Sequence, residues 1–282
     1  MSLTRAIAAA TLLTATSALS AAAATYIEPG VTTVQVQHAG RNANAVNNAA
    51  GQYLNMGINY NTRNTDTGLP TNQSGSRTGT AVGVRLIDVA LSATETLAQI
   101  PAICIEVAQG FWNPRNTQTY QVRSTFYNDE TQSYLGKLAH LAWDQMIEVT
   151  QKVATNAQEA TDKAVYGAAY QLAVWELTHE GVAGGLDVTT GSFNATGSAA
   201  NVQAARTLAN EWLTTIKAGD YDGFRQLTYL HNSMYQDLIV DLEPPYVPPV
   251  DPPQPVPVPA AGLLLLGGLG ALGALRRRRK TA

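Results

Sequence analysis

The chain has 282 residues, and 45% of them are hydrophobic, which is enough to bury the core of one large or two small domains. Six of its eighteen basic residues are Arg5 and the run 276–280, and these end segments hold no acidic residue. The rest of the chain carries twelve basic against 21 acidic side chains, a net charge of -9. Nucleic-acid binding needs clustered Lys and Arg, so this balance argues against a nucleic-acid-binding protein.

The first 24 residues have the layout of a secretory signal peptide. Arg5 is followed by an apolar run over 6–19 and by the small residues of 20–24. This order of parts predicts export and cleavage near Ala24, so that the mature chain begins near Thr25. An Ala-rich helix of the fold is the alternative interpretation, but the run lacks an amphipathic period.

Alternating and β-branched runs predict strands in the first half of the mature chain. These runs cover residues 31–38, 52–60, 81–91, 97–107 and 117–125. The polar segment between the third and the fourth run indicates a hairpin, and its second arm carries Cys104. Residues 40–80 are dense in Asn, Gly, Thr and Ser and predict surface loops apart from the one short run, above all in the Asn-rich segment 41–72.

The pattern changes to a helical spacing of apolar residues over 131–218. Three helices are predicted, at 131–155, 157–180 and 198–218. Asn156 is the break between the first two, and the glycines of 181–185 end the second. Strand character returns at 226–230 and 235–242. The order of strands, helices and strands predicts an α+β fold.

The C-terminal part consists of consecutive segments of different composition. A Pro-rich linker over 244–255 is expected to be extended and stiff. An apolar run over 261–275 and the basic block 276–280 follow, and the run is short for a permanent transmembrane helix, which needs about 20 residues. Directly before the apolar run stands a short motif made of Val256, Pro257, Val258, Pro259 and Ala260.

This tail, residues 256–282, resembles the PEP-CTERM sorting signals of Gram-negative bacteria, and more closely their Val-Pro-Leu-Pro-Ala variant, with Val258 in place of Leu. The resemblance implies transient passage through the inner membrane and trimming near the motif by an exosortase-type enzyme. It further implies delivery to the outer envelope or the extracellular matrix. An ordinary tail anchor is the alternative, and both interpretations place residues 25–255 outside the cytoplasm.

Cys104 is the single cysteine of the chain, so an exported protein of this sequence has no internal disulfide. The thiol is therefore a buried bystander, an intermolecular link or a reactive group. No cysteine pair is present for zinc, and no motif implies a metal or an organic cofactor. A cysteine hydrolase would need Cys104 beside one of the four scattered histidines, and sequence spacing leaves this open.

Cys104 and Gln171 form a more specific pair. Cys104 stands between Ile103 and Ile105 on a predicted strand. Gln171 lies on a predicted helix, with Trp175 one turn later on the same face and able to cover it. A thiolate pressed against a glutamine carboxamide in a dry pocket can attack the amide carbon and expel ammonia, which leaves an internal thioester. A nearby amine can then capture the acyl group as a stable amide.

At these two motifs the chain resembles the thioester domain of bacterial surface proteins, whose second signature reads Thr-Gln-x-Ala-Ile-Trp. Gln171, Ala173 and Trp175 match this signature, while Tyr170 replaces the Thr and Val174 replaces the Ile. The resemblance spans residues 27–243 of an expected domain over 25–243, and it rests on two short motifs, of which only the second is distinctive. It implies a β-rich, sandwich-like or barrel-like domain with an inserted helical subdomain of about three helices.

The resemblance also implies that Cys104 and Gln171 are joined side chain to side chain, with Trp175, Tyr170 and His179 shielding or supporting the bond. His179 is a candidate for proton transfer or, alternatively, a plain histidine on the helix surface. The implied function is a covalent adhesin that reacts once with an amine-bearing surface ligand and is no turnover enzyme. The alternative is a non-reactive structural protein of an exopolysaccharide or biofilm matrix, in which Cys104 is only a core residue.

Overall fold

The computed structural model describes residues 31–38, 53–63, 70–90, 97–110, 117–125 and 127–242. The chain divides into two compact units, Met1–Pro245 and Tyr246–Ala282, and all described residues belong to the first. The predicted signal peptide, the Pro-rich linker and the sorting motif 256–260 lie outside the described residues. Within the described part, no helix is both long and apolar enough to cross a membrane.

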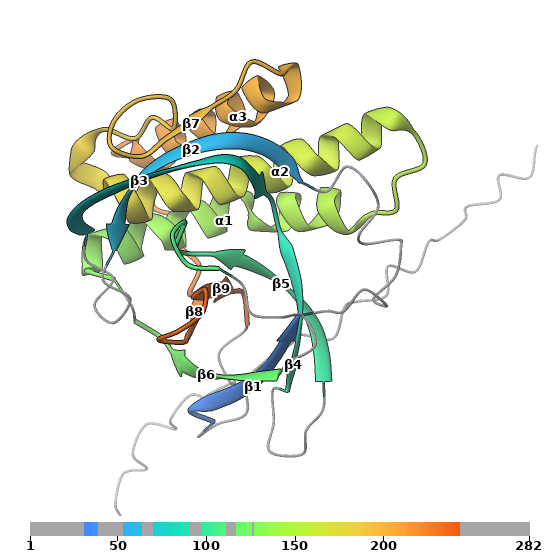
Figure 1. Cartoon of the computed structure of the whole chain (residues 1–282), viewed down its shortest axis with the longest axis vertical. Helices are drawn as coiled ribbons and strands as arrows, with labels where there is room; N and C mark the ends of the chain where they lie inside the picture. The colour runs from blue at the N-terminus through green and yellow to red at the C-terminus, as the bar shows by residue number, and fades with distance from the viewer. Residues whose placement is uncertain are drawn as a thin grey trace, which may run out of the picture. The chain divides into compact units, whose positions relative to one another are not determined.

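Six antiparallel strands close into a barrel in the order β1-β4-β5-β9-β8-β6 (Figure 1). These strands are β1 (Thr33–His38), β4 (Arg85–Ala90), β5 (Leu97–Cys104), β6 (Thr117–Arg123), β8 (Thr228–His231) and β9 (Leu238–Val240). The predicted hairpin of the third and fourth runs is confirmed, because β4 pairs antiparallel with β5 and Ile87 faces Ile100 across it. The barrel joins strands from both ends of the described chain, so the helices between β6 and β8 are an insertion.

The end of β5 is buried on both of its faces. Ile103, Cys104 and Ile105 are all buried, although neighbouring strand side chains point in opposite directions. One face of the strand belongs to the barrel wall, and the other is covered by the second helix, which lies against β5. Cys104 is thereby fixed in a regular strand with protein on both sides.

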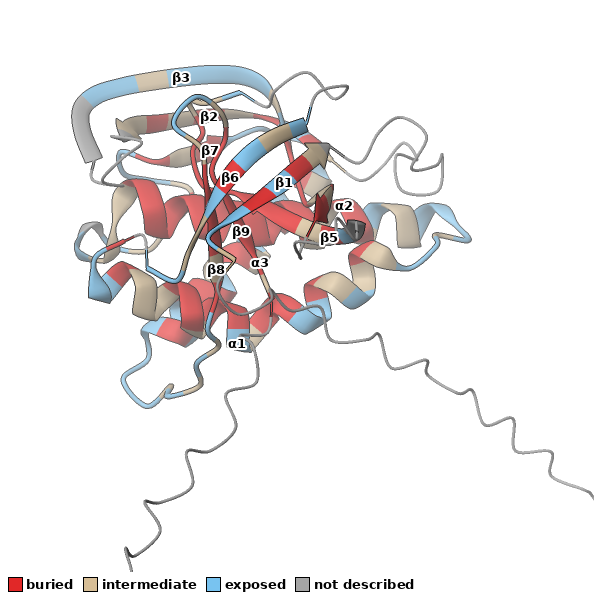
Figure 2. Ribbon diagram, turned by 90° about the horizontal axis from the view of Figure 1, so that it is seen from below, coloured by how far each residue is buried: buried red, intermediate tan, exposed pale blue. Residues whose placement is uncertain are grey.

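A second sheet has the order β3-β2-β7, with β2 (Leu54–Arg63), β3 (Pro70–Val82) and β7 (Asn194–Thr196). The short run predicted at 52–60 is confirmed as β2. The prediction of loops through residue 80 is wrong for β3, whose polar residues form a strand of 13 residues. The cause is exposure: Figure 2 shows β3 mostly in the exposed colour at the sheet edge, so its sequence carries no apolar alternation.

Three helices lie between β6 and β8: α1 (Asp129–Gln151), α2 (Ala157–Trp175) and α3 (Ala200–Lys217). The predicted break at Asn156 is confirmed, because its side chain caps α2 by accepting a hydrogen bond from the N–H of Glu159 at 2.9 Å. The second helix does not run unchanged to residue 180 as predicted. After Trp175 it continues as a π-helical turn, η1 (Glu176–Glu180), and Gly181 ends it at a φ of 81°.

The second helix, α2, is the central element of the fold. It packs against α1 and α3 on one side and against β2, β3 and β5 on the other. Every residue from Gly167 to Trp175 is buried, which Figure 2 shows as the red part of α2. Together with the barrel, the three helices confirm the predicted α+β fold class. The helical insertion also contributes a strand to the second sheet, because β7 pairs with β2.

Candidate functional site

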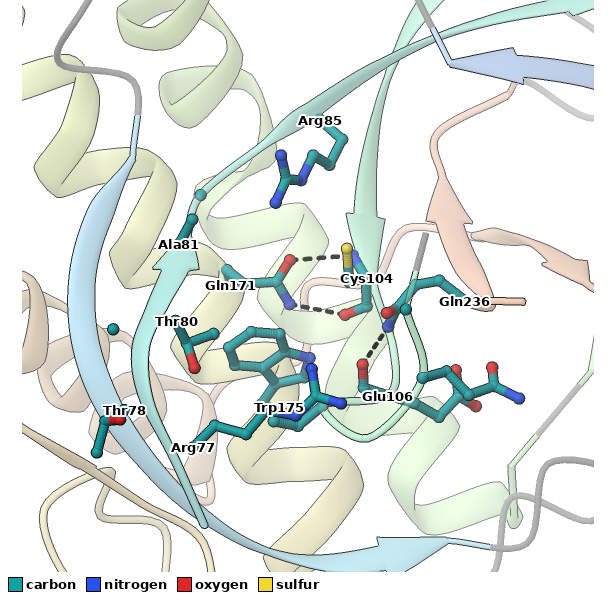
Figure 3. A pocket seen from close by; sticks show the side chains of 15 residues that line it. Arg77, Thr78, Thr80, Ala81, Arg85, Cys104, Glu106, Gln171, Trp175 and Gln236 are labelled. Carbon is teal, nitrogen blue, oxygen red and sulfur yellow. Dashed lines mark hydrogen bonds between the residues drawn. The ribbon is translucent and has the colours of Figure 1, made fainter. Parts of the chain in front are cut away.

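A cavity of about 440 Å³ lies where both sheets meet α2. Its walls come from β3, the start of β4, the end of β5 with the segment that follows it, and α2 (Figure 3). Cys104, Gln171 and Trp175 all line this cavity. The structure thus brings together a strand residue and a helix residue that are 67 positions apart in the sequence.

The carboxamide of Gln171 pairs with the backbone of Cys104 through two hydrogen bonds (Figure 3). The N–H of Cys104 donates to Oε1 of Gln171 at 3.0 Å, and Nε2 of Gln171 donates to the carbonyl oxygen of Cys104 at 2.6 Å. Both residues are buried. Because both groups of the amide are engaged by one residue, the carboxamide is held in a fixed orientation against the backbone of Cys104.

The surroundings of Cys104 keep its thiol protonated at neutral pH. Burial raises the pKa of Cys104 to about 12, since a thiolate is poorly stabilised away from water. The carboxylate of Glu106 raises this pKa further, whereas the guanidinium of Arg85 lowers it by its charge and by a hydrogen bond to the Cys104 side chain. The thiol therefore needs a local cation to react as a nucleophile.

Trp175 covers the pair from the side of α2. It lies one helical turn after Gln171, and Figure 3 shows its indole beside Gln171, on the side of Thr80 and Arg77. Its side chain is 4% exposed, and its ring packs edge-on against Phe193 at a centroid distance of 6.3 Å. The indole Nε1 is buried and has no hydrogen-bond partner among the described residues. The aromatic bulk next to the carboxamide excludes water from it.

Tyr170 is buried but does not line the cavity. Its ring packs edge-on against Trp143 of α1 at 5.5 Å and against Trp212 of α3 at 6.2 Å. Neighbouring residues of a helix point about 100° apart, so the residue before Gln171 faces the other helices. Its contribution is to the packing that holds α2 in place.

His179 lies in η1 and is 1% exposed, so the alternative of a helix-surface histidine is wrong. Its Nδ1 donates to the carbonyl oxygen of Asn61 at 2.7 Å, and its Nε2 accepts from the N–H of Val107 at 3.3 Å. Nε2 also lies 3.3 Å from the carbonyl oxygen of Ile105, so both ring nitrogens have backbone partners. His179 thereby ties β2 to the segment after Cys104, and it does not line the cavity.

The sequence did not indicate three other polar residues of the cavity, Arg85, Glu106 and Gln236. Glu106 accepts a hydrogen bond from the N–H of Asp237 at 3.0 Å, and Nε2 of Gln236 donates to the carbonyl oxygen of Glu106. Arg85 lies within the strand predicted at 81–91, and no motif distinguishes it there. The one available signal was its place as a charged residue in a buried hairpin arm opposite the arm of Cys104.

The other two histidines whose side chains are described have partners other than Cys104. His140 contacts the hydroxyl of Tyr221 at 3.0 Å, and Nδ1 of His231 is hydrogen-bonded to the carboxylate of Asp237 at 2.8 Å. Neither lines the cavity. Over the described ranges, no group of three or more His, Cys, Asp or Glu side chains could hold a metal ion.

Comparison with known proteins does not assign the chain to a family. No protein-family model matches it, and searches of curated proteins and of solved structures gave no significant match.

Proposed function

We propose that this protein is an exported surface or matrix protein whose Cys104 and Gln171 form an internal thioester that captures amines on a target. The single observation that carries the proposal is the pairing of the Gln171 carboxamide with the Cys104 backbone, two buried groups at the wall of one cavity. The motif resemblance and the sorting tail support it from the sequence. Each molecule reacts once, so the protein acts by covalent attachment and not by turnover.

The hydrogen bonds of the pair suit thioester formation. When Sγ of Cys104 attacks Cδ of Gln171, the charge that develops on Oε1 meets the Cys104 N–H that already donates to it at 3.0 Å. A donor aimed at a developing oxyanion lowers the barrier to acyl transfer. The C–N bond of the amide then breaks, and ammonia leaves with the proton of the thiol.

The surrounding structure suits a thioester that must survive in water until it meets its target. Trp175 and the apolar neighbours of Cys104 keep bulk water from the acyl carbon. The cavity of about 440 Å³ gives an amine room to approach. Attack of the amine nitrogen on Cδ forms an amide and returns the electron pair of the C–S bond to the sulfur of Cys104. The target would then stay attached to Gln171.

A non-reactive structural protein of an exopolysaccharide or biofilm matrix is the second candidate. The observation that favours it is the raised pKa of Cys104, which is the normal state of an inert core cysteine. In that case the pairing of Gln171 with Cys104 would only hold α2 against β5. Both candidates share the exported location that the sorting tail predicts, in the cell envelope or the extracellular matrix.

Intact mass separates the two candidates. The mass of the purified protein, with its two ends identified by peptide mapping, is compared with the mass calculated from the sequence and with that of Cys104→Ala. We expect the parent alone to be lighter by one ammonia. Incubation with methylamine should add the mass of one methylamine at Gln171 of the parent and nothing to the variant.

The matched variant makes the result decisive, because Cys104→Ala keeps the backbone groups that bind Gln171 and loses only the sulfur. Full calculated mass and a freely alkylated Cys104, in protein never exposed to nucleophiles, would rule the thioester out. The structural role would then be the better assignment.

A further inference from the structure

Arg85 is placed by strand register on the same side of the barrel wall as Cys104. It pairs with Ala102 across the β4–β5 hairpin, and Cys104 follows Ala102 by two positions. Directly paired residues of an antiparallel hairpin share a face, and residues two apart on a strand share it as well. Arg85 and Cys104 are therefore diagonal neighbours, and both line the cavity with Gln171.

The guanidinium of Arg85 is held in position from outside the pair. Its central carbon lies 4.4 Å from the centroid of the Tyr53 ring, a cation–π contact that restricts a long and otherwise flexible side chain. Figure 3 shows the guanidinium extending toward the ends of Gln171 and Cys104. Its positive charge lowers the pKa of the Cys104 thiol, against the effect of burial. The sequence expectations gave this residue no role.

We propose that Arg85 is the catalytic cation of this site, which holds the negative charge on the Cys104 sulfur when the thioester forms and again when an amine opens it. The inference rests on the proposed function and adds the group that makes a buried sulfur reactive. In formation, the bond between Sγ and Cδ of Gln171 replaces the C–N bond, and ammonia takes the thiol proton. In opening, a C–N bond to the amine replaces the C–S bond, and the proton released by the amine ends on the sulfur.

The charges around Cys104 explain why such a cation is needed. Burial disfavours the thiolate, and the carboxylate of Glu106 disfavours it further. The phenol of Tyr120 lies near Cys104 on the barrel side, and burial raises its pKa above the ordinary value, so it is neutral. Arg85 is the group that acts in the opposite direction on Cys104. A cation next to a sulfur is the usual means of making a cysteine reactive.

The first experiment measures thiolate character without a thioester. In the Gln171→Ala background, which cannot form the bond, the rate of Cys104 alkylation by iodoacetamide is followed from pH 7 to pH 10. Adding Arg85→Gln should slow alkylation about tenfold or more at each pH, since an adjacent opposite charge shifts a pKa by about one to three units. Arg85→Lys should restore part of the rate. Arg123→Gln, which removes an arginine of another barrel strand, should change nothing.

The second experiment follows the thioester itself. Refolded Arg85→Gln should lose ammonia, and react with methylamine, about tenfold or more slowly than the parent. Thermal unfolding checks that each variant is folded. Tyr53→Leu keeps the arginine but removes the ring that packs against it, so its reaction rates should lie between those of the parent and those of Arg85→Gln. Equal alkylation profiles with and without Arg85 would overturn the inference. A parent of full calculated mass whose alkylation still depends on Arg85 would instead refute the proposed function alone.

Discussion

Gln171 binds the backbone of Cys104, so the sulfur can be changed without breaking either hydrogen bond. Cys104→Ser should therefore keep the fold of the site, whereas Gln171→Ala leaves a buried N–H and a buried carbonyl oxygen unpaired. An orphaned buried polar group costs about 1–3 kcal/mol. We expect Gln171→Ala to be less stable than Cys104→Ser by about 2–5 kcal/mol in urea unfolding, and neither variant forms a thioester. Equal stability would mean that water replaces the carboxamide.

At this scale the resemblance of two short motifs, of which only the one around Gln171 is distinctive, was enough to predict that Cys104 and Gln171 meet. The place of Arg85 could not be predicted in the same way. It depends on the register of β4 against β5, which brings Arg85 opposite Ala102. The orientation of Tyr170 also depended on three-dimensional packing, since the aromatic rings of α1 and α3 are what it turns toward.

The π-helical turn η1 contains a carboxyl group whose burial favours the neutral form. Glu176 is fully buried, and burial raises its pKa from 4.5 to about 8, against a hydrogen bond from the N–H of Asp187. A carboxyl with a raised pKa binds a proton in the folded state that the unfolded state has lost, so stability is greatest below pH 4.5 and falls up to pH 8.

Glu176→Gln keeps the shape and removes this titration. We expect the parent to lose several kcal/mol of unfolding free energy relative to the variant between pH 4.5 and 8.5, on the order of 3–5. Urea denaturation of both proteins at these two pH values measures the difference. If the two proteins differ in unfolding free energy by the same amount at both pH values, Glu176 is solvated or ionised in the folded protein.

The sequence predicted those helices and strands that have one buried face. The apolar spacing of α1 and α3 predicted these helices, and the two apolar runs around a polar segment predicted the hairpin of β4 and β5. β3 was missed because most of its described residues before Val82 are exposed, and the change from α2 to η1 was missed because the chain stays helical and buried through His179, with no glycine or proline in η1 before Gly181. Neither feature has a periodic signal in the residues that form it.

At the scale of the whole chain, the separation of Cys104 and Gln171 in the sequence would decide when the proposed thioester can form. Cys104 and Gln171 are 67 positions apart and meet only when β5 packs on α2. A chain that crosses the inner membrane unfolded would therefore form its thioester after export, away from the amines of the cytoplasm. The signal peptide and the sorting tail predicted from the sequence thus agree with a reactive site that depends on folding.

The tail makes a prediction about release of the protein. Replacing Pro257 and Pro259 by Ala should block recognition of the 256–260 motif, so that the apolar run 261–275 stays on the protein and holds it in the membrane fraction. The matched control replaces Pro248 and Pro249 in the linker by Ala. This variant should be trimmed like the parent, because its 256–260 motif is intact. Cell fractionation with mass analysis of the C-terminus distinguishes the two. Recovery of surface protein that still carries residues 261–282 would show that the tail is a lasting anchor.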